Sequence, residues 1–140
     1  MTHYRTAYRN AVKDAIAGDA AFGDFTFLPA WSQKIDPSQL PVFGVATPSE
    51  GSSRQGGDTV HRVTTVRVAM KVVEAGDIEA ELDDLSFDIE ALVLPVLEPL
   101  SHIVELNSTA TSTEAGGERK TGTLVMDFSV TRFTDAGNAT

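Results

Sequence analysis

The stretch Thr59–Leu100 constrains this chain more than any other, because a long strand pattern is followed directly by a long helix pattern. Along its first part, apolar residues occupy every second position, at Val66, Val68, Met70 and Val72. A period of two is typical of a β-strand that is buried on one face. Gly76 interrupts the pattern and is predicted to end the strand.

An amphipathic helix is predicted immediately after this glycine. Asp77 suits the N-cap, and Glu79 and Glu81 place carboxylates at the positive end of the helix dipole. The apolar residues that follow recur at spacings of three and four, so they share one face: Ile78, Leu82, Leu85, Ile89 and Leu92. Pro95 lacks a backbone donor and is expected to end or kink the helix.

A first helix is predicted over Thr2–Ala17, with Thr2 as N-cap and Gly18 as the residue that stops it. One face of this helix is apolar or aromatic, at Tyr4, Ala7, Tyr8, Ala11, Val12, Ala15 and Ile16. A second face is basic and is predicted to be solvated, although an acidic neighbour could use it; it carries Arg5, Arg9 and Lys13.

The segment between the two helices is predicted to contain an extended piece, a short strand and a long loop. Phe22–Ile35 is expected to be extended, with an interruption at Pro29. Val42–Ala46 is typical of a short buried strand. Ser49–Asp58 is rich in Gly and Ser and has no apolar residue, which predicts a long mobile loop.

Two further strands are predicted over Ile103–Thr113 and Thr121–Phe133, joined by a hairpin loop over Glu114–Lys120. In the first strand we expect one face to carry Val104, Leu106 and Ala110 and the other to carry Glu105, Asn107, Thr109, Thr111 and Thr113. In the second strand we expect Leu124, Met126, Phe128 and Val130 to point inward and Asp127, Ser129 and Thr131 to point outward.

This order of elements predicts an α+β fold with a single, mostly antiparallel sheet of four to five strands and two main helices packed on one face. The chain has 140 residues, which fits one domain. We expect residues 1–134 to form that domain and residues 135–140 to form a flexible C-terminal tail. The polar second faces of the strands could meet water or a neighbouring subunit.

Composition excludes several classes of site. The absence of Cys excludes disulfides and thiolate metal sites and favours an intracellular origin. The net charge of −9 argues against a surface that grips phosphates, because nucleic-acid affinity comes largely from Lys and Arg. The start of the chain has no apolar signal-peptide core, and the apolar run Ala91–Leu97 is too short to span a bilayer.

Motifs for catalysis or for metal and cofactor binding were not found. His3, His61 and His102 are far apart and lack the spacing of a zinc site. The Gly-rich stretch Gly51–Gly57 lacks the Gly-Lys-Ser/Thr of a phosphate-binding loop, and no Gly-x-Ser-x-Gly elbow occurs. The sequence therefore predicts no catalytic residue, no metal and no cofactor.

Acidic residues cluster in the second helix without an intervening base. They are Glu79, Glu81, Asp83, Asp84, Asp88 and Glu90. Three interpretations stay open: a solvated outer face, a wall facing a DNA channel or weak divalent-cation site, and a subunit interface with basic residues of a neighbour. The basic residues available for such an interface are Arg5, Arg9, Arg62, Arg67 and Lys71.

The order of features resembles the tail terminator proteins of long-tailed bacteriophages, the lambda-type minor tail protein family. An N-terminal helix leads to the strand LPVFGV at Leu40–Val45 and the polar stretch SEGSSRQGGD. The long strand VHRVTTVRVAMKVVE, the helix GDIEAELDDLSFDIEALV and the closing strand GTLVMDFSVTRF follow. The resemblance covers nearly all of Thr2–Phe133 and rests on this order and not on an invariant catalytic residue.

The resemblance implies a structural virion protein and not an enzyme. Such proteins form a ring, usually of six copies, on the head-proximal end of the tail tube, after assembly in the host cytoplasm. The ring stops tube polymerisation and presents a surface for the head-completion (neck) protein. DNA passes through its hole without specific binding.

On this interpretation the two polar loops contact the tail tube or the head-completion protein and become ordered on binding. The candidate interface residues are Arg54, Gln55, Arg62, Arg67, Lys71, Asp84, Asp88, Glu118, Arg119 and Lys120. Two alternatives stay open: another neck or tail-completion protein of the same virion, and a small α+β enzyme or ligand-binding domain with a pocket under the helix that begins at Ile78.

Overall fold

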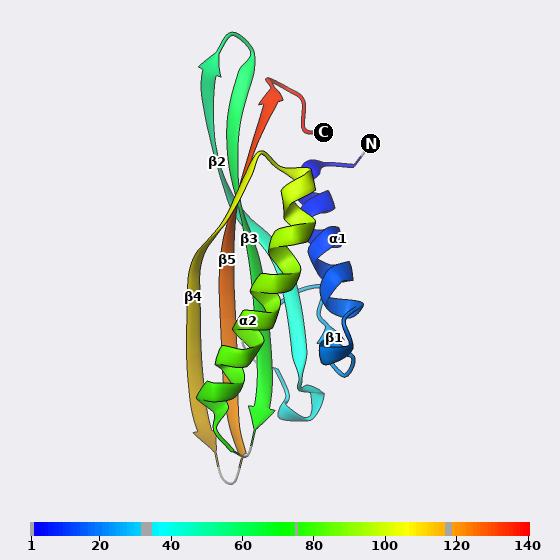
Figure 1. Ribbon diagram of the computed structural model, residues 1–140, viewed down its shortest axis with the longest axis vertical. Helices are drawn as coiled ribbons and strands as arrows, with labels where there is room; N and C mark the ends of the chain where they lie inside the picture. The colour runs from blue at the N-terminus through cyan, green and yellow to red at the C-terminus, as the bar shows by residue number, and fades with distance from the viewer. Residues whose placement is uncertain (1, 32–34, 75, 117–118) are drawn as a thin grey trace.

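A computed structural model describes residues 2–31, 35–74, 76–116 and 119–140. These residues form an α+β fold with one five-stranded sheet and two long helices, drawn in Figure 1. The helices are α1 (Tyr4–Ala17) and α2 (Ile78–Leu97). The strands are β1 (Thr26–Phe27), β2 (Val42–Gly56), β3 (Thr59–Glu74), β4 (Ile103–Gly116) and β5 (Arg119–Asp135).

The strands lie in the order β1-β2-β3-β5-β4. Only β1 and β2 run parallel, and the other neighbours are antiparallel. The prediction of an α+β fold with a mostly antiparallel sheet of four to five strands is therefore confirmed. Of the extended piece predicted over Phe22–Ile35, only Thr26–Phe27 forms a strand in the described residues.

The core lies on the face of the sheet formed by alternate residues of β3 and β5. Val66 lies opposite Phe128, and Val68 lies opposite Met126. The alternating residues of both strands are buried as predicted: Val66, Val68, Met70, Val72, Leu124, Met126, Phe128 and Val130. Burial of one such side chain contributes roughly 1.5–3 kcal/mol, so this face is a main source of stability.

Helix α2 packs onto this face through a stripe of residues spaced three and four apart. Asp77 caps the helix as predicted, because its Oδ1 accepts a hydrogen bond from the Ala80 amide at 3.1 Å. The buried stripe is longer than predicted, and Leu92 is half-buried beside it; the stripe consists of Ile78, Leu82, Leu85, Ile89, Val93 and Leu97. Pro95 does not end the helix, which continues to Leu97 with the proline on its exposed side.

Helix α1 begins at Tyr4, and its N-cap is His3, not Thr2 as predicted. The His3 Nδ1 atom accepts a hydrogen bond from the Arg5 amide at 3.1 Å, which satisfies one of the free donors of the first turn. The helix buries every fourth residue, at Tyr4, Tyr8, Val12 and Ile16. These side chains join those of α2, β3 and β5 in one core cluster.

The basic face of α1 is not simply solvated. The Arg9 Nη1 atom donates a hydrogen bond to Thr47 Oγ1 at 2.6 Å, and the Lys13 Nζ atom lies 4.5 Å from the centre of the Phe27 ring. Both contacts fasten α1 to the strands beside it.

The long loop predicted over Ser49–Asp58 is wrong, because β2 continues to Gly56 and pairs with β3 almost to its end. Only residues 57 and 58 form the turn, with Gly57 at a positive φ of 53°. Apart from half-buried Glu50, the residues of this part of β2 are exposed on both faces, so the segment has no apolar alternation that would indicate a strand. The predicted Glu114–Lys120 loop is also too long, since Ala115 pairs with Lys120 and Gly116 with Arg119.

The predicted assignment of β4 side chains to the two faces of the sheet is wrong beyond Leu106, because a β-bulge reverses it. The register shifts between Leu106 and Ser108, so Asn107 is an extra residue without a partner on β5. After the bulge, Ala110 lies opposite Val125, on the side of the sheet away from Leu106. Thr109, Thr111 and Thr113 therefore lie on the core side of the sheet.

The two long hairpins lie at opposite ends of the molecule, as Figure 1 shows. The β2–β3 turn is at the end where β5 finishes, because Thr59 pairs with Asp135. The other end holds the start of β5, because Glu74 pairs with Lys120. Both termini lie near the β2–β3 end.

The C-terminal residues, predicted to be flexible, are linked to this end by backbone hydrogen bonds. The Tyr4 amide donates to Ala139 O at 3.0 Å, and the Ala136 amide donates to Asp58 O at 2.6 Å. Thr134 is buried and Ala139 packs against the core. Their flexibility in solution stays a prediction.

We predict that Gly122→Ala destabilises the fold by about 1–3 kcal/mol, because overpacking displaces well-packed side chains. A Cβ at Gly122 would lie 2.8 Å from Ile78 Cγ1 and 3.0 Å from Leu82 Cδ1. Urea unfolding followed by circular dichroism measures the change. Gly51→Ala is the matched control, since a Cβ there meets nothing within 4 Å. Equal unfolding midpoints for the two variants would contradict the packing of α2 on β5.

Candidate functional site

The face of the sheet opposite the core is predominantly polar, and we call it the outer face. By the alternation of β3 and β5, the central part of this face carries Val63, Thr65, Arg67, Ala69, Lys71, Thr123, Val125, Asp127, Ser129 and Thr131. Apart from buried Ala69 and exposed Arg67, these residues are half-buried. The outward direction predicted for Asp127, Ser129 and Thr131 is confirmed.

A hollow of about 370 Å³ lies on the outer face, and we call it the Trp31 hollow. One wall is the chain segment 28–31, in which Leu28 and Trp31 lie beside Gly44 of β2. A Cβ at Gly44 would lie 3.0 Å from Trp31 Cε3, so the indole packs closely against the strand. The other lining residues are small or apolar apart from Arg67: Val45, Ala46, Pro48, Ala69 and Val125.

An ion pair lies at the rim of this hollow. The Arg67 Nε and Nη2 atoms donate to the two carboxylate oxygens of Asp127 at 2.8 and 3.0 Å. This bidentate pair joins directly opposed residues of β3 and β5. The Arg67 side chain is nevertheless 45% exposed, so solvent screens the pair and its contribution to stability is small.

A second polar cluster joins the β2–β3 hairpin to α1, and we call it the Glu50 cluster. The Glu50 carboxylate accepts hydrogen bonds from the Tyr4 hydroxyl and from Thr64 Oγ1, the latter at 2.8 Å. The Arg62 Nη1 atom lies 3.7 Å from Glu50 Oε2, and the Arg62 Nε atom donates to Thr134 Oγ1 at 2.6 Å. The cluster thus connects α1, β2, β3 and β5.

Within this cluster, the pKa of Glu50 is lowered and the pKa of Tyr4 is raised. Burial opposes ionisation of Glu50, but the hydrogen bonds from Tyr4 and Thr64 and the charges of Arg5 and Arg62 outweigh it and lower the pKa. Burial, followed by the hydrogen bond and charge of Glu50, raises the pKa of Tyr4 to about 12. Glu50 is therefore held ionised and Tyr4 neutral, which suits an acceptor and its donor.

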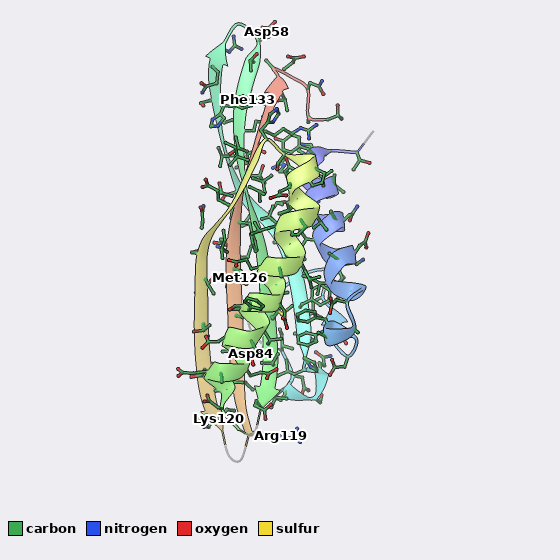
Figure 2. The ribbon with its side chains drawn as sticks, in the orientation of Figure 1. Asp58, Asp84, Arg119, Lys120, Met126 and Phe133 are labelled. Atoms are coloured by element: carbon green, nitrogen blue, oxygen red, sulfur yellow. The ribbon has the colours of Figure 1, made fainter. Side chains whose placement is uncertain are left out.

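The predicted interface residues are distributed over several surfaces. Arg54 and Gln55 are exposed near the β2–β3 turn, and Arg119 and Lys120 are exposed at the opposite end. Figure 2 shows this separation through Asp58 at one end and both basic residues at the other.

The remaining predicted residues occupy other positions. Asp84 is exposed on α2, and Asp88 is half-buried on the same helix. Arg62 and Arg67 both contact carboxylates of their own chain. Arg67 and Lys71 share the outer face, whereas Glu118 lies outside the described residues.

Sequence reasoning missed the Trp31 hollow and the Glu50 cluster. The single Trp of the chain is a signal for the hollow, but nothing in the sequence places it over Gly44. Glu50 belongs to the stretch predicted as a loop, so its burial could not be foreseen.

The exposed apolar side chains were missed as well. Phe87 is 73% exposed, Ile103 is 55% exposed, and Phe133 lies 5.1 Å from both the His61 and His102 rings. In the described residues, no group of His, Asp or Glu is placed to hold a metal ion. None of the described helices is both long and apolar enough to cross a membrane.

Comparison with known proteins adds no family assignment, since neither a protein-family model nor a characterised protein matches this chain.

We predict that the stabilising effect of Glu50 depends on pH. Because its folded-state pKa lies below the unfolded value of about 4.3, its contribution is present above that pH and is lost as pH falls through the folded-state pKa. At pH 7, Glu50→Gln is expected to lower the free energy of unfolding by about 1–3 kcal/mol relative to the wild type. Urea unfolding from pH 7 to pH 3 measures both chains.

The difference between the two chains should shrink as the pH falls below about 4. Ser52→Ala is a control on the same strand, since Ser52 is exposed. A Glu50→Gln difference that stays constant down to pH 3 would exclude a contribution from the carboxylate charge.

Proposed function

We propose that this chain is a structural virion protein that forms a ring on the head-proximal end of a phage tail tube. The ring, of six copies in this proposal, stops tube polymerisation, presents a surface for the head-completion protein and lets DNA pass through its hole. The protein acts by shape and self-association, and carries out no catalysis.

The observation that carries this proposal is the unpartnered outer face. The proposal takes both helices to lie on one face of the sheet, which is supported by the single core cluster that their buried side chains form with β3 and β5. The other face then carries Thr, Ser, an ion pair and a shallow hollow lined by Trp31 and Arg67, and Trp and Arg are residue types that are enriched where proteins pack against each other.

Two open strand edges also favour association. In the described residues, β4 pairs only with β5, and β2 beyond Phe43 pairs only with β3. Unpaired edges expose backbone donors and acceptors, and these can pair with another chain. A head-to-tail contact that closes gives a ring, whereas one that does not close gives a filament.

The position of the two hairpins favours two unlike partners. The β2–β3 end and the β4–β5 end are separated by the length of β3, about 50 Å for 16 residues. One end can therefore contact the tail tube while the other contacts the head-completion protein. In this proposal the exposed Arg54 and Gln55 serve one contact, and Arg119 and Lys120 serve the other.

We predict that the purified protein forms closed rings on tail tubes of its own virus and halts their growth. Negative-stain electron microscopy of tubes assembled with and without the protein measures ring formation and tube length. A chain lacking residues 54–60, with Asn-Gly joining Ser53 to His61, is the diagnostic variant, because Ser53 and His61 are paired and Asn-Gly favours a two-residue turn.

The shortened variant should keep the fold and lose attachment to one partner. Arg119→Ala combined with Lys120→Ala is the counterpart at the other end and should affect the other partner. Tubes of unchanged length in the presence of excess wild-type protein, with only dispersed monomers in the images, would exclude the ring proposal.

A specific observation favours a second candidate, a small-molecule-binding domain. The volume of the Trp31 hollow falls within the range of about 300–1,000 Å³ that is usual for ligand sites. The sequence-based alternative placed a pocket under α2, but Gly122 there lacks room even for a Cβ beside Ile78 and Leu82. A ligand in the hollow would change Trp31 fluorescence, which a screen of small apolar compounds measures.

A further inference from the structure

Phe87 is the most exposed large apolar side chain in the described part of the molecule. It lies on α2 away from the buried stripe and is 73% exposed. Asp83 and Asp84 lie one turn before it and Ala91 one turn after it, and all three are exposed. One exposed apolar residue is ordinary, but here the residue stands on a ridge of small and acidic side chains.

The Trp31 hollow has the complementary form. Its lining includes the apolar residues Ala46, Ala69 and Val125, and its volume of about 370 Å³ exceeds the roughly 150 Å³ of a protein cavity that binds benzene. Arg67 lies at its rim and Lys71 lies two residues beyond Ala69 on the same face. Asp127 neutralises one of these two cations, so one positive charge remains there.

Phe87 and the Trp31 hollow lie on opposite sides of the molecule. Helix α2 packs on the core face, where its Ile78 and Leu82 meet Gly122, and Phe87 points away from that packing. The hollow lies on the outer face, beside Ala69 and Val125. In a two-fold dimer, both copies contribute the same surface patch to the interface. Because Phe87 and the hollow lie on opposite sides of one molecule, they can meet only in a head-to-tail contact between two copies.

We infer that Phe87 of one copy inserts into the Trp31 hollow of the next copy. This inference rests on the proposed ring and identifies its subunit contact. Asp83 and Asp84 then lie toward Lys71 of the neighbour, the cation of the outer face that Asp127 does not neutralise. A buried aromatic anchor at the centre of an interface typically carries much of the binding free energy.

Replacement of Phe87 tests the anchor. Phe87→Ala should raise the concentration required for half-assembly of rings by about 30-fold or more, the change expected on loss of a hot spot. Mass photometry measures assembly, and thermal unfolding checks the fold, which an exposed residue should leave unchanged. Ile103→Ala is the matched control, because Ile103 is also exposed and lies about 20 Å along the sheet from the hollow.

Disulfide cross-linking tests the contact directly, since the native chain has no Cys. Asp84→Cys and Lys71→Cys, which face each other across the inferred contact, are combined in one chain that retains Phe87 and are oxidised with copper–phenanthroline after ring assembly. A disulfide requires Cβ atoms about 3.5–4.5 Å apart, so covalent oligomers up to the full ring are expected only if the two positions meet. The single-Cys variants should stay monomeric on denaturing gels.

The outcomes separate this contact from the proposed function. Rings that assemble normally with Phe87→Ala and do not cross-link would overturn the contact and leave the ring proposal intact. A hollow that binds an apolar compound while the protein stays monomeric would overturn both. Loss of assembly by Phe87→Ala together with a cross-linked ladder supports the contact.

Discussion

Residue-by-residue pairing of β3 with β5, from Thr59 and Asp135 to Glu74 and Lys120, is the interaction on which the other elements depend. The pairing places Val66, Met70 and their partners on one continuous apolar face. The buried residues of α1, spaced four apart, and of α2, spaced three and four apart, join the residues of that face in one core cluster. Since alternate side chains of a strand point in opposite directions, the same pairing creates the outer face.

The sequence predicts elements well where burial imposes a period. The inward residues of β3 and β5 and most of the buried stripe of α2 follow from apolar spacing, and the N-cap Asp77 follows from the capping preference of Asp at the start of that stripe. The hairpins were mispredicted because most of their side chains are exposed, so burial imposes no period there. From Ser49 to Gly56, β2 is held by backbone pairing while most of its side chains are exposed, so the chain carries no apolar signal there. Asn107 carries no local sign that it will bulge and reverse the faces of β4.

The candidate site was predictable only at the level of its polar character. Arg67 and Lys71 could be assigned to one face from alternation, but the contact between Trp31 and Gly44 joins segments that no local period relates. The same holds for the Glu50 cluster, which requires α1 and three strands to meet. Long-range packing therefore determines both the hollow and the cluster, whereas local patterns determine the strands and helices that carry them.

The hydrogen bond from the Tyr4 amide to Ala139 O brings the beginning and the end of the described chain together. A fluorescent protein or affinity handle fused to either terminus would therefore emerge from the same pole of the molecule (Figure 1). The pole with Arg119 and Lys120 would stay unobstructed in both fusions. An attached label can thus report the orientation of the subunit in any larger particle, whichever terminus carries it.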